Sequence, residues 1–298
     1  MNPLEIQWYP GHMVKAKKLI QENLGLVDVV IEMVDARIPY SSRNPDMQFI
    51  LSSKPRLIIL NKNDLANPEK TKAWSAYFGR QGISTVALNS LSARGTEKVV
   101  AAASALVSER MESLKSRGWR ERPIRAMIVG IPNVGKSSFI NALTRRSAAK
   151  VGEKPGVTRG KQWIRIGDDF ELLDTPGILW PKFEDPEVGF KLAVTGAVSD
   201  LVYDVEEVGA RLLLLLSQAA PDSLMSRYRL EHVASDLESA YALLREIGAR
   251  RGYLHTGGEV DTDKAAYLVL HEFRDGRIGQ ITLDQVPEEN QDQVAVVQ

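Results

Sequence analysis

The stretch Gly130-Ile131-Pro132-Asn133-Val134-Gly135-Lys136-Ser137 decides the fold, because it matches GxxxxGK[ST], the pattern of a phosphate-binding loop. Glycines in such a loop let backbone N–H groups approach the β-phosphate. The lysine spans the β and γ oxygens, and the hydroxyl group binds Mg²⁺. We assign nucleotide binding to the loop and its immediate neighbour, with these residues as candidates: Gly130, Asn133, Val134, Gly135, Lys136, Ser137 and Ser138.

The surroundings of this loop fit the assignment. An apolar run over residues 124–129 predicts a short strand before it, and residues 138–143 have helical spacing after it. A strand, a loop and a helix in this order are what the motif requires, so a chance match is disfavoured.

A guanine-recognition motif lies earlier in the chain, where Asn61-Lys62-Asn63-Asp64 matches NKxD. The Asp64 carboxylate can accept from the ring N–H and the exocyclic amine of guanine, and adenine shows the opposite pattern. We expect Asn61 to brace the phosphate loop and Lys62 to lie along the base and ribose. The motif follows the apolar run 56–60, so Asp64 is expected at the carboxyl end of a buried parallel strand, where such folds bind ligands.

A third base contact is expected at the end of the next strand, which residues 84–88 predict. Asn89-Ser90 follows it, and the Ser90 N–H is our candidate donor to the O6 atom of guanine. Ser92-Ala93 is a competing register that stays open at this point.

The γ-phosphate and metal contacts should come from two further segments. Thr158, in Gly156-Val157-Thr158-Arg159, is the candidate Mg²⁺ ligand of switch I. Residues 162–166 and 170–173 predict a hairpin that delivers Asp174 to the metal. Asp174-Thr175-Pro176-Gly177 matches the DxxG of switch II, in which the Gly177 N–H would reach the γ-phosphate.

The order of these motifs is inverted, because an ordinary GTPase carries the phosphate loop first and NKxD last. The chain therefore predicts an α/β, circularly permuted P-loop GTPase domain followed by a smaller, mostly α-helical domain. A single helix is expected from about Glu97 to Lys115. The predicted divisions are a permuted G domain at 1–182 (basic leader 1–24, guanine half 25–115, phosphate half 124–182), a helical domain at 183–285 and a polar tail at 286–298.

Composition narrows the class of protein. The 298 residues exceed one usual domain, and the absence of cysteine excludes disulfides and thiol catalysis. No run approaches the roughly 18 apolar residues of a spanning helix. We expect a cytoplasmic monomer without a membrane partner.

The net charge of zero hides an asymmetry. Residues 1–182 carry 28 Lys and Arg against 17 Asp and Glu, and residues 183–298 carry 10 against 21. Basic clusters with interspersed tryptophans favour phosphate contact and base stacking on RNA over a merely solvated surface. The clusters are Lys15-Lys17-Lys18, Arg117-Arg120-Arg122-Arg125, Arg145-Arg146-Lys150 and Arg159-Lys161-Arg165.

The motifs together resemble one family. Trp8-Tyr9-Pro10-Gly11-His12-Met13, Asp35-Ala36-Arg37-Ile38-Pro39, NKND, GIPNVGKSS, PGVTRGKQW and DTPGI are similar to the RbgA/YlqF type of permuted GTPase, ribosome biogenesis GTPase A. The resemblance implies GTP hydrolysis in late assembly of the large (50S) ribosomal subunit, rRNA binding, stimulation by the particle and release after hydrolysis. It also implies a C-terminal bundle similar to RNA-binding ANTAR modules. The acidic balance of that half leaves Arg227-Arg229 and Arg245-Arg250-Arg251 as its RNA candidates.

Two residues bear on catalysis. Ile178 follows DxxG where Ras-type enzymes use a glutamine, and isoleucine cannot orient the attacking water. His12 can accept a proton near neutral pH, and the resemblance assigns its matching histidine to catalysis, although contact with RNA or packing on Trp8 is an alternative role. The resemblance also implies that Asn133 holds K⁺, where a turn-forming role is the alternative.

Two other functions stay open on the sequence alone. One is an RNA-binding module gated by nucleotide, in which hydrolysis is incidental. The other is a GTPase that acts on a non-ribosomal RNA.

Overall fold

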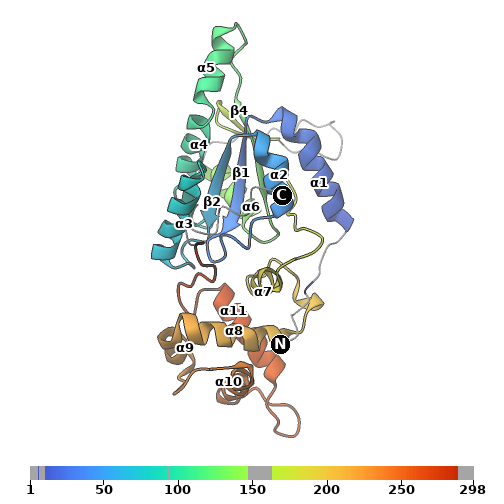
Figure 1. Ribbon diagram of the computed structural model, residues 1–298, viewed down its shortest axis with the longest axis vertical. Helices are drawn as coiled ribbons and strands as arrows, with labels where there is room; N and C mark the ends of the chain where they lie inside the picture. Colours follow the sequence, from blue (N-terminus) through green and yellow to red (C-terminus); the bar gives the residue numbers. More distant parts are fainter. Residues whose placement is uncertain (1–5, 7–10, 93, 147–162, 288–298) are drawn as a thin grey trace.

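The computed structural model describes residue 6 and residues 11–92, 94–146 and 163–287 (Figure 1). The predictions that involve Thr158, Trp8, Tyr9 and the tail beyond residue 287 lie outside these residues. So does the side chain of His12, although its backbone is described.

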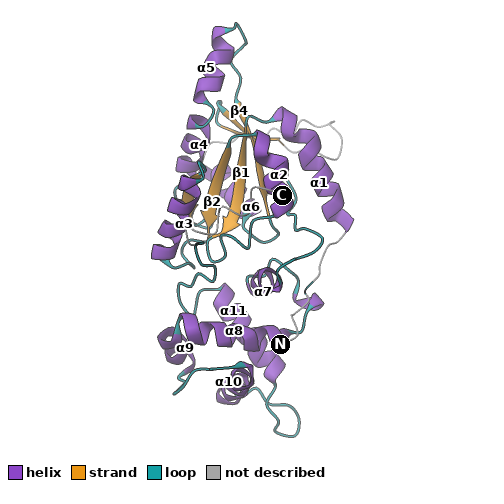
Figure 2. Ribbon diagram, viewed as in Figure 1, coloured by secondary structure: helices purple, strands orange, loops and turns teal. Residues whose placement is uncertain are grey.

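A six-stranded sheet forms the centre of the larger domain (Figure 2), in the order β3-β2-β1-β4-β6-β5. Neighbouring strands are parallel except β5, which runs antiparallel to β6. The strands are β1 (Val29–Asp35), β2 (Arg56–Asn61), β3 (Ser84–Leu88), β4 (Ile124–Gly130), β5 (Trp163–Ile166) and β6 (Phe170–Asp174). Since β1 pairs with β4, the two halves of the permuted domain share one sheet, and their strand ends meet at one edge.

Both faces of the central strands are buried, which explains their continuous apolar runs. On β2, Ile58 and Leu60 belong to the same cluster as Trp74 and Phe78, which come from α3 (Pro68–Arg80). Leu57 and Ile59 belong to the other, larger cluster, together with residues of α4 and α6. The alternation places helices on both sides of the sheet.

Two helices of this domain, α2 (Pro45–Ile50) and α3, begin at an asparagine cap followed by proline. Asn67 accepts a hydrogen bond from the Lys70 N–H ahead of Pro68, a typical start for α3. The others are α1 (Gly11–Asn23), α4 (Thr96–Ala105), α5 (Ser108–Ser116) and α6 (Lys136–Arg146).

The expected single helix over 97–115 is wrong in one respect, since the structure has two helices there. Val107 interrupts them with a non-helical backbone at φ −118° and ψ 2°. Its side chain is 1% exposed and joins the core. Burial of a β-branched side chain outweighs helix continuation at this position. The second helix, α5, then projects beyond the sheet (Figure 1).

Within residues 183–287, the smaller domain has five α-helices, in agreement with the mostly helical domain expected from the sequence. They are α7 (Pro186–Val194), α8 (Val205–Ala219), α9 (Pro221–Tyr228), α10 (Leu237–Arg250) and α11 (Thr262–Arg274). Asp185, Asp204, Asp236 and Asp261 accept backbone hydrogen bonds at four helix N-termini. Part of the acidic excess of this half is therefore structural. A Cβ atom at Gly209 of α8 would lie 2.7 Å from the Ala266 Cβ of α11, so glycine permits the close packing of these helices.

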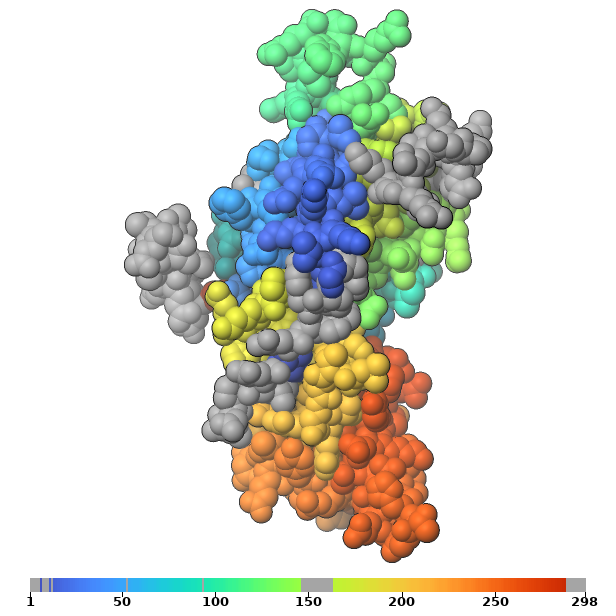
Figure 3. Space-filling model, turned by 90° about the vertical axis from the view of Figure 1, so that its right-hand side faces the viewer, coloured from blue at the N-terminus to red at the C-terminus, as the bar shows by residue number. Residues whose placement is uncertain are grey.

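Two described segments of the chain run from one domain to the other. One is the chain after β6, which leads through switch II to α7. The other is the segment after α11, which returns to the larger domain beside α3 (Figure 1). We call residues 278–284 the strap. Figure 3 shows α1 in blue above the yellow segment before α7, with the helical domain below them.

Candidate nucleotide-binding site

The phosphate loop connects β4 to α6 at the carboxyl edge of the sheet. Lys136 begins α6 and is 8% exposed, and its Nζ atom donates to the carbonyls of Gly130 (3.0 Å) and Ile131 (2.9 Å). Burial lowers the pKa of Lys136 to about 8, although the negative charge of Asp174 opposes the shift. A polyphosphate would supply the charge that stabilises this buried ammonium group.

Two glycines of the loop are required by close approaches to the guanine half. At Gly130, with φ +157°, a Cβ atom would lie 2.6 Å from the Met33 carbonyl oxygen. At Gly135, with φ +104°, it would lie 2.3 Å from the Asn61 Nδ2 atom. Both contacts reach from the phosphate loop to β1 or β2 of the other half, so the loop packs directly on the base-recognition side.

Asn61 connects three parts of the candidate site. Its Nδ2 atom donates to the Val134 carbonyl at 2.7 Å, and its Oδ1 atom accepts from the Ser90 N–H (3.0 Å) and hydroxyl (2.7 Å). The expected brace between NKxD and the phosphate loop is thus a direct hydrogen bond.

The same geometry separates the two registers for the third base contact. Ser90 is 4% exposed and hydrogen-bonded to Asn61, whereas Ser92 is exposed, so the structure favours Asn89-Ser90. The Ser90 N–H, the candidate donor to the guanine O6, donates to Asn61 in this structure. The Asn89 side chain accepts from the Leu91 N–H at 2.8 Å. Ser90 therefore braces Asn61, and Asn89 holds the turn that follows.

The Asp64 carboxylate is exposed at the same edge. Lys62, two residues earlier, adopts φ +58°, an uncommon left-handed conformation for a lysine. Its Nζ atom lies 3.0 Å from the Asp35 carboxylate. The bend at Lys62 turns the chain so that Asp64 lies beyond the end of β2.

Lys62 is supported by a buried cluster of ion pairs. The structural role of this cluster was not predicted from the sequence. Arg37, 1% exposed, makes two side-chain hydrogen bonds to Asp35, at 2.9 Å and 2.7 Å. Burial alone would raise the pKa of Asp35, but the charges of Arg37 and Lys62 outweigh it and hold the pKa well below its usual range. The available signal was Asp35 and Arg37 at the end of a mostly apolar, buried strand.

Replacement of Arg37 by methionine is expected to lower the free energy of unfolding by about 3 kcal/mol at pH 7, because the Asp35 carboxylate would keep only Lys62 and the backbone N–H of residue 37 as partners. The lowered pKa of Asp35 contributes stability above its unfolded pKa of about 3.9, and this contribution is lost as the pH falls below it. The difference between wild type and variant should therefore shrink between pH 7 and pH 3. Urea unfolding at both pH values measures it. A double variant with Asp35→Asn should lose less than the single variant, and a larger loss would contradict the proposed cause.

Switch II begins at the end of β6 and rests against the phosphate loop. Burial raises the pKa of Asp174. The Thr175 hydroxyl donates to the Ile128 carbonyl at 2.6 Å, and the Ile178 N–H donates to the Gly130 carbonyl at 3.2 Å. Ser137 is exposed in the first turn of α6. Oxygen ligands for Mg²⁺ are thus available from Ser137 and Asp174, a donor set that suits this hard cation.

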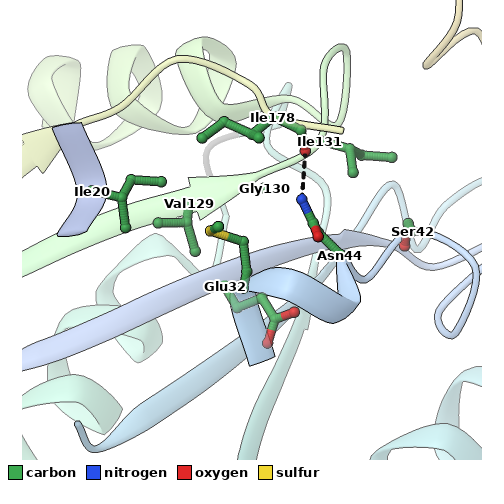
Figure 4. Close-up of a pocket in the computed structure, with 9 residues that line it drawn as sticks. Ile20, Glu32, Ser42, Asn44, Val129, Gly130, Ile131 and Ile178 are labelled. Atoms are coloured by element: carbon green, nitrogen blue, oxygen red, sulfur yellow. Dashed lines mark hydrogen bonds between the residues drawn. The ribbon is translucent and has the colours of Figure 1, made fainter. Parts of the chain in front are cut away.

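A small pocket lies behind switch II (Figure 4). The Asn44 Nδ2 atom donates to the Ile178 carbonyl at 3.5 Å across it, and Ile20 of α1 forms part of its wall. Ile178 itself is 3% exposed. The residue after DxxG therefore packs inward and offers no polar side chain to a water molecule. The pocket is lined by Ile20, Glu32, Ser42, Asn44, Met47, Val129, Gly130, Ile131 and Ile178.

Asn133 connects the phosphate loop to the helical domain. It has φ +56°, and its Nδ2 atom donates to the Gly196 carbonyl at 2.7 Å. Gly196 lies just after α7, so this contact could not be read from the sequence. The amide nitrogen is committed to the helical domain, while the Oδ1 atom remains as an oxygen ligand.

Similar proteins were found by sequence and by structure. The profile of the 50S ribosome-binding GTPase family matches residues 125–237. The chain is 47% identical over 293 residues to ribosome biogenesis GTPase A of Bacillus cereus, with 98% of each chain covered. It is 36% identical over 299 residues to mitochondrial ribosome-associated GTPase 1 of Xenopus tropicalis, covering 93% and 94% of the two chains. Among solved structures, GNP-bound YlqF from T. maritima matches with a TM-score of 0.66 at 26% identity, over 92% of this chain and 99% of the other.

The strand order and the gathering of the motifs at one sheet edge define a circularly permuted GTPase. The family profile begins at Arg125 because the phosphate half starts there, and the guanine half precedes it. The chain belongs to the ribosome biogenesis GTPase A family. This confirms the resemblance and the predicted GTPase activity.

Proposed function

We propose that this GTPase acts in the cytoplasm as a monomer, binds the large ribosomal subunit late in its assembly, contacts rRNA and leaves after GTP hydrolysis. The observation that carries the proposal is 47% identity to a ribosome biogenesis GTPase A over 98% of both chains. In the described part of the chain, no helix is long and apolar enough to cross a membrane.

The nucleotide roles follow the geometry. Asp64 reads guanine, with Asn61 and Lys62 holding the base-recognition side and Lys136 binding the β and γ phosphates. Ser137, Asp174 and Thr158 hold Mg²⁺, which neutralises charge on the phosphates when it is bound. The Gly177 N–H binds the γ-phosphate. The support is that Asn61 is hydrogen-bonded to the Val134 carbonyl at 2.7 Å, which keeps the two halves in register.

K⁺ is proposed as a second cation beside Asn133. Carbonyl-type oxygens replace the hydration shell of this ion. The hydrogen bond from Asn133 Nδ2 to Gly196 leaves Oδ1 as the free oxygen of the amide. The helical domain thereby fixes the direction of the proposed ligand.

The proposed RNA surface contains fewer residues than the basic clusters identified in the sequence. Arg122 pairs with buried Asp28 at 2.7 Å, and Arg125 pairs with Glu171 at 3.0 Å, so both stabilise the fold. At the tip of α5, by contrast, Trp119 is 67% exposed, and Arg117 and Arg120 are exposed beside it. Exposed guanidinium groups and an indole ring suit phosphate contact and base stacking. We call Arg117, Trp119 and Arg120, which follow α5, the basic tip.

The proposal is tested by co-sedimentation with purified large subunits and by GTP hydrolysis in K⁺ and Na⁺ buffers. We expect pelleting with a non-hydrolysable GTP analogue but not with GDP. We also expect slow intrinsic hydrolysis that subunits stimulate, more strongly in K⁺. An Arg117→Ala/Arg120→Ala variant should pellet several-fold less, because phosphate contacts are lost.

The matched control is Lys72→Ala/Lys98→Ala, which removes the same charge from exposed positions on α3 and α4. Fast turnover unchanged by subunits would contradict the proposed function. Pelleting with tRNA in preference to subunits would indicate a GTPase that serves a different RNA.

A further inference from the structure

The strap lies against the loop that carries Asp64. We call residues 62–67 the base loop. We infer that the strap is a positioning element for guanine recognition, so that the C-terminal domain sets the base selectivity of the nucleotide site. This inference rests on the guanine role proposed for Asp64.

Three strap residues hydrogen-bond to the base loop. The Gln280 Nε2 atom donates to the Asp64 carbonyl at 3.0 Å, and the Ile281 N–H donates to the Leu65 carbonyl at 3.0 Å. The Thr282 hydroxyl accepts from the Asn67 N–H at 3.1 Å. On the sheet side, the Asn63 N–H of the base loop donates to the Leu88 carbonyl at 3.3 Å.

The base loop needs this support. Lys62 adopts a left-handed conformation, which costs a non-glycine residue about 1 kcal/mol and persists where the surroundings enforce it. Within the described residues, no hydrogen bond or ion pair holds the Asp64 carboxylate. Its direction therefore depends on the backbone, and the strap binds that backbone at the carbonyl of Asp64 itself.

The strap is itself firmly anchored. Asp284 is 2% exposed and accepts from the N–H groups of Tyr40 and Ser41, both at 2.8 Å. It also lies 3.0 Å from the Lys191 Nζ atom of α7. One carboxylate thus ties the strap to the loop after β1 and to the helix that follows switch II.

A second contact, between Gly276 and Leu65, holds the base loop against the helical domain. Gly276, at φ +75°, ends α11, and a Cβ atom there would lie 2.6 Å from the Leu65 Cδ2 atom. Leu65 therefore packs directly on the end of the helical domain. Leu65 is part of the base loop and adjoins Asp64 in the chain. A shift of the helical domain would therefore move Asp64.

Base selectivity should respond to the loss of these contacts. A carboxylate that accepts from two adjacent guanine donors needs both bonds aligned, and such pairing discriminates strongly only when the acceptor is held in place. Inosine diphosphate (IDP) lacks the exocyclic amine and so offers one of the two donors. Misalignment of Asp64 should weaken GDP binding more than IDP binding.

The test compares dissociation constants for GDP and IDP, measured by calorimetry on the full chain. For Gln280→Ala/Thr282→Val we expect GDP binding to weaken about tenfold and the preference for GDP over IDP to fall about threefold or more. Thr282→Ser keeps the hydroxyl and should retain the preference. Arg277→Ala, at an exposed position just before the strap, is the matched control and should behave as wild type.

Asp64→Asn separates this inference from the proposed function. If Asp64→Asn leaves the preference for GDP unchanged, the guanine role of Asp64 is wrong. If Asp64→Asn abolishes the preference and the strap variant retains it, the strap inference is overturned. If the double variant unfolds, Gln280→Ala alone replaces it, because Gln280 is exposed and this variant should fold. It should lower the preference for GDP over IDP in the same direction.

Discussion

A His12→Ala variant is expected to hydrolyse GTP about 10²- to 10⁴-fold more slowly than wild type in the presence of large subunits, the usual effect of losing a general base. Its affinity for GTP should be unchanged, because the phosphate and base contacts come from other residues. Single-turnover hydrolysis and nucleotide binding, measured on the same samples, distinguish a loss of chemistry from a loss of binding.

The reason for this expectation is that the residues of switch II that the structure describes cannot position water. Ile178 is buried, its N–H donates to Gly130 and its carbonyl accepts from Asn44. The Thr175 hydroxyl is committed to the Ile128 carbonyl. The other histidines of the chain, His232, His255 and His271, follow residue 230 and belong to the helical domain.

The path of the leader supports His12 as the candidate. Ile6 is buried beside Gly189 of α7, and Ile20 of α1 lines the pocket behind Ile178. His12 lies between these two positions in the chain, at the second residue of α1. Two described residues of the leader thus flank His12 in the chain, with Ile6 against α7 and Ile20 at the pocket behind switch II.

The control is His255→Ala, which removes an exposed histidine from the helical domain and should not change the rate. A histidine base also predicts that the wild-type rate falls as the pH drops below about 6.5, whereas the residual rate of His12→Ala should not follow that titration. If His12→Ala keeps the rate that subunits stimulate, His12 is not the general base, and a role in binding RNA is favoured instead.

The sequence predicted the fold well because each motif follows a strand with a local signature. The apolar runs before Asp64, Gly130 and Asp174 are short, buried and parallel, and motif order then determines which strands are adjacent. The break at Val107 was missed because burial of one side chain against the core is a tertiary effect. Helical spacing alone continues across it.

The contacts between the domains could not be predicted in the same way. Gln280 and Asp64 are 216 residues apart, and Asn133 and Gly196 are 63 apart, with no periodic pattern to pair them. Backbone carbonyls serve as partners in both cases, so residue types give no signal. The contact of the Ser90 N–H with Asn61 could not be predicted for a related reason, because Asn61 is a side chain from another strand end.

Replacement of Gly177 by alanine is expected to reduce hydrolysis about 10²- to 10³-fold, the usual cost of losing one backbone donor to a developing charge. A Cβ atom at Gly177 would lie 2.8 Å from the Cα and N atoms of Pro132 and 3.1 Å from the carbonyl carbon of Ile131. These are backbone atoms of the phosphate loop, so they cannot rotate away. The methyl group would push switch II off the loop and move its N–H away from the γ-phosphate.

The effect should be confined to the triphosphate state. GDP lacks the γ-phosphate, so its affinity should stay within about threefold of wild type, while a GTP analogue should lose its advantage over GDP. Calorimetry with both nucleotides and single-turnover hydrolysis measure these quantities. Gly79→Ala is the matched control, because no atom lies within 4 Å of a Cβ there and α3 tolerates alanine. Equal losses of GDP and GTP analogue binding would mean that the methyl group disrupts the phosphate loop itself, and not the switch that rests on it.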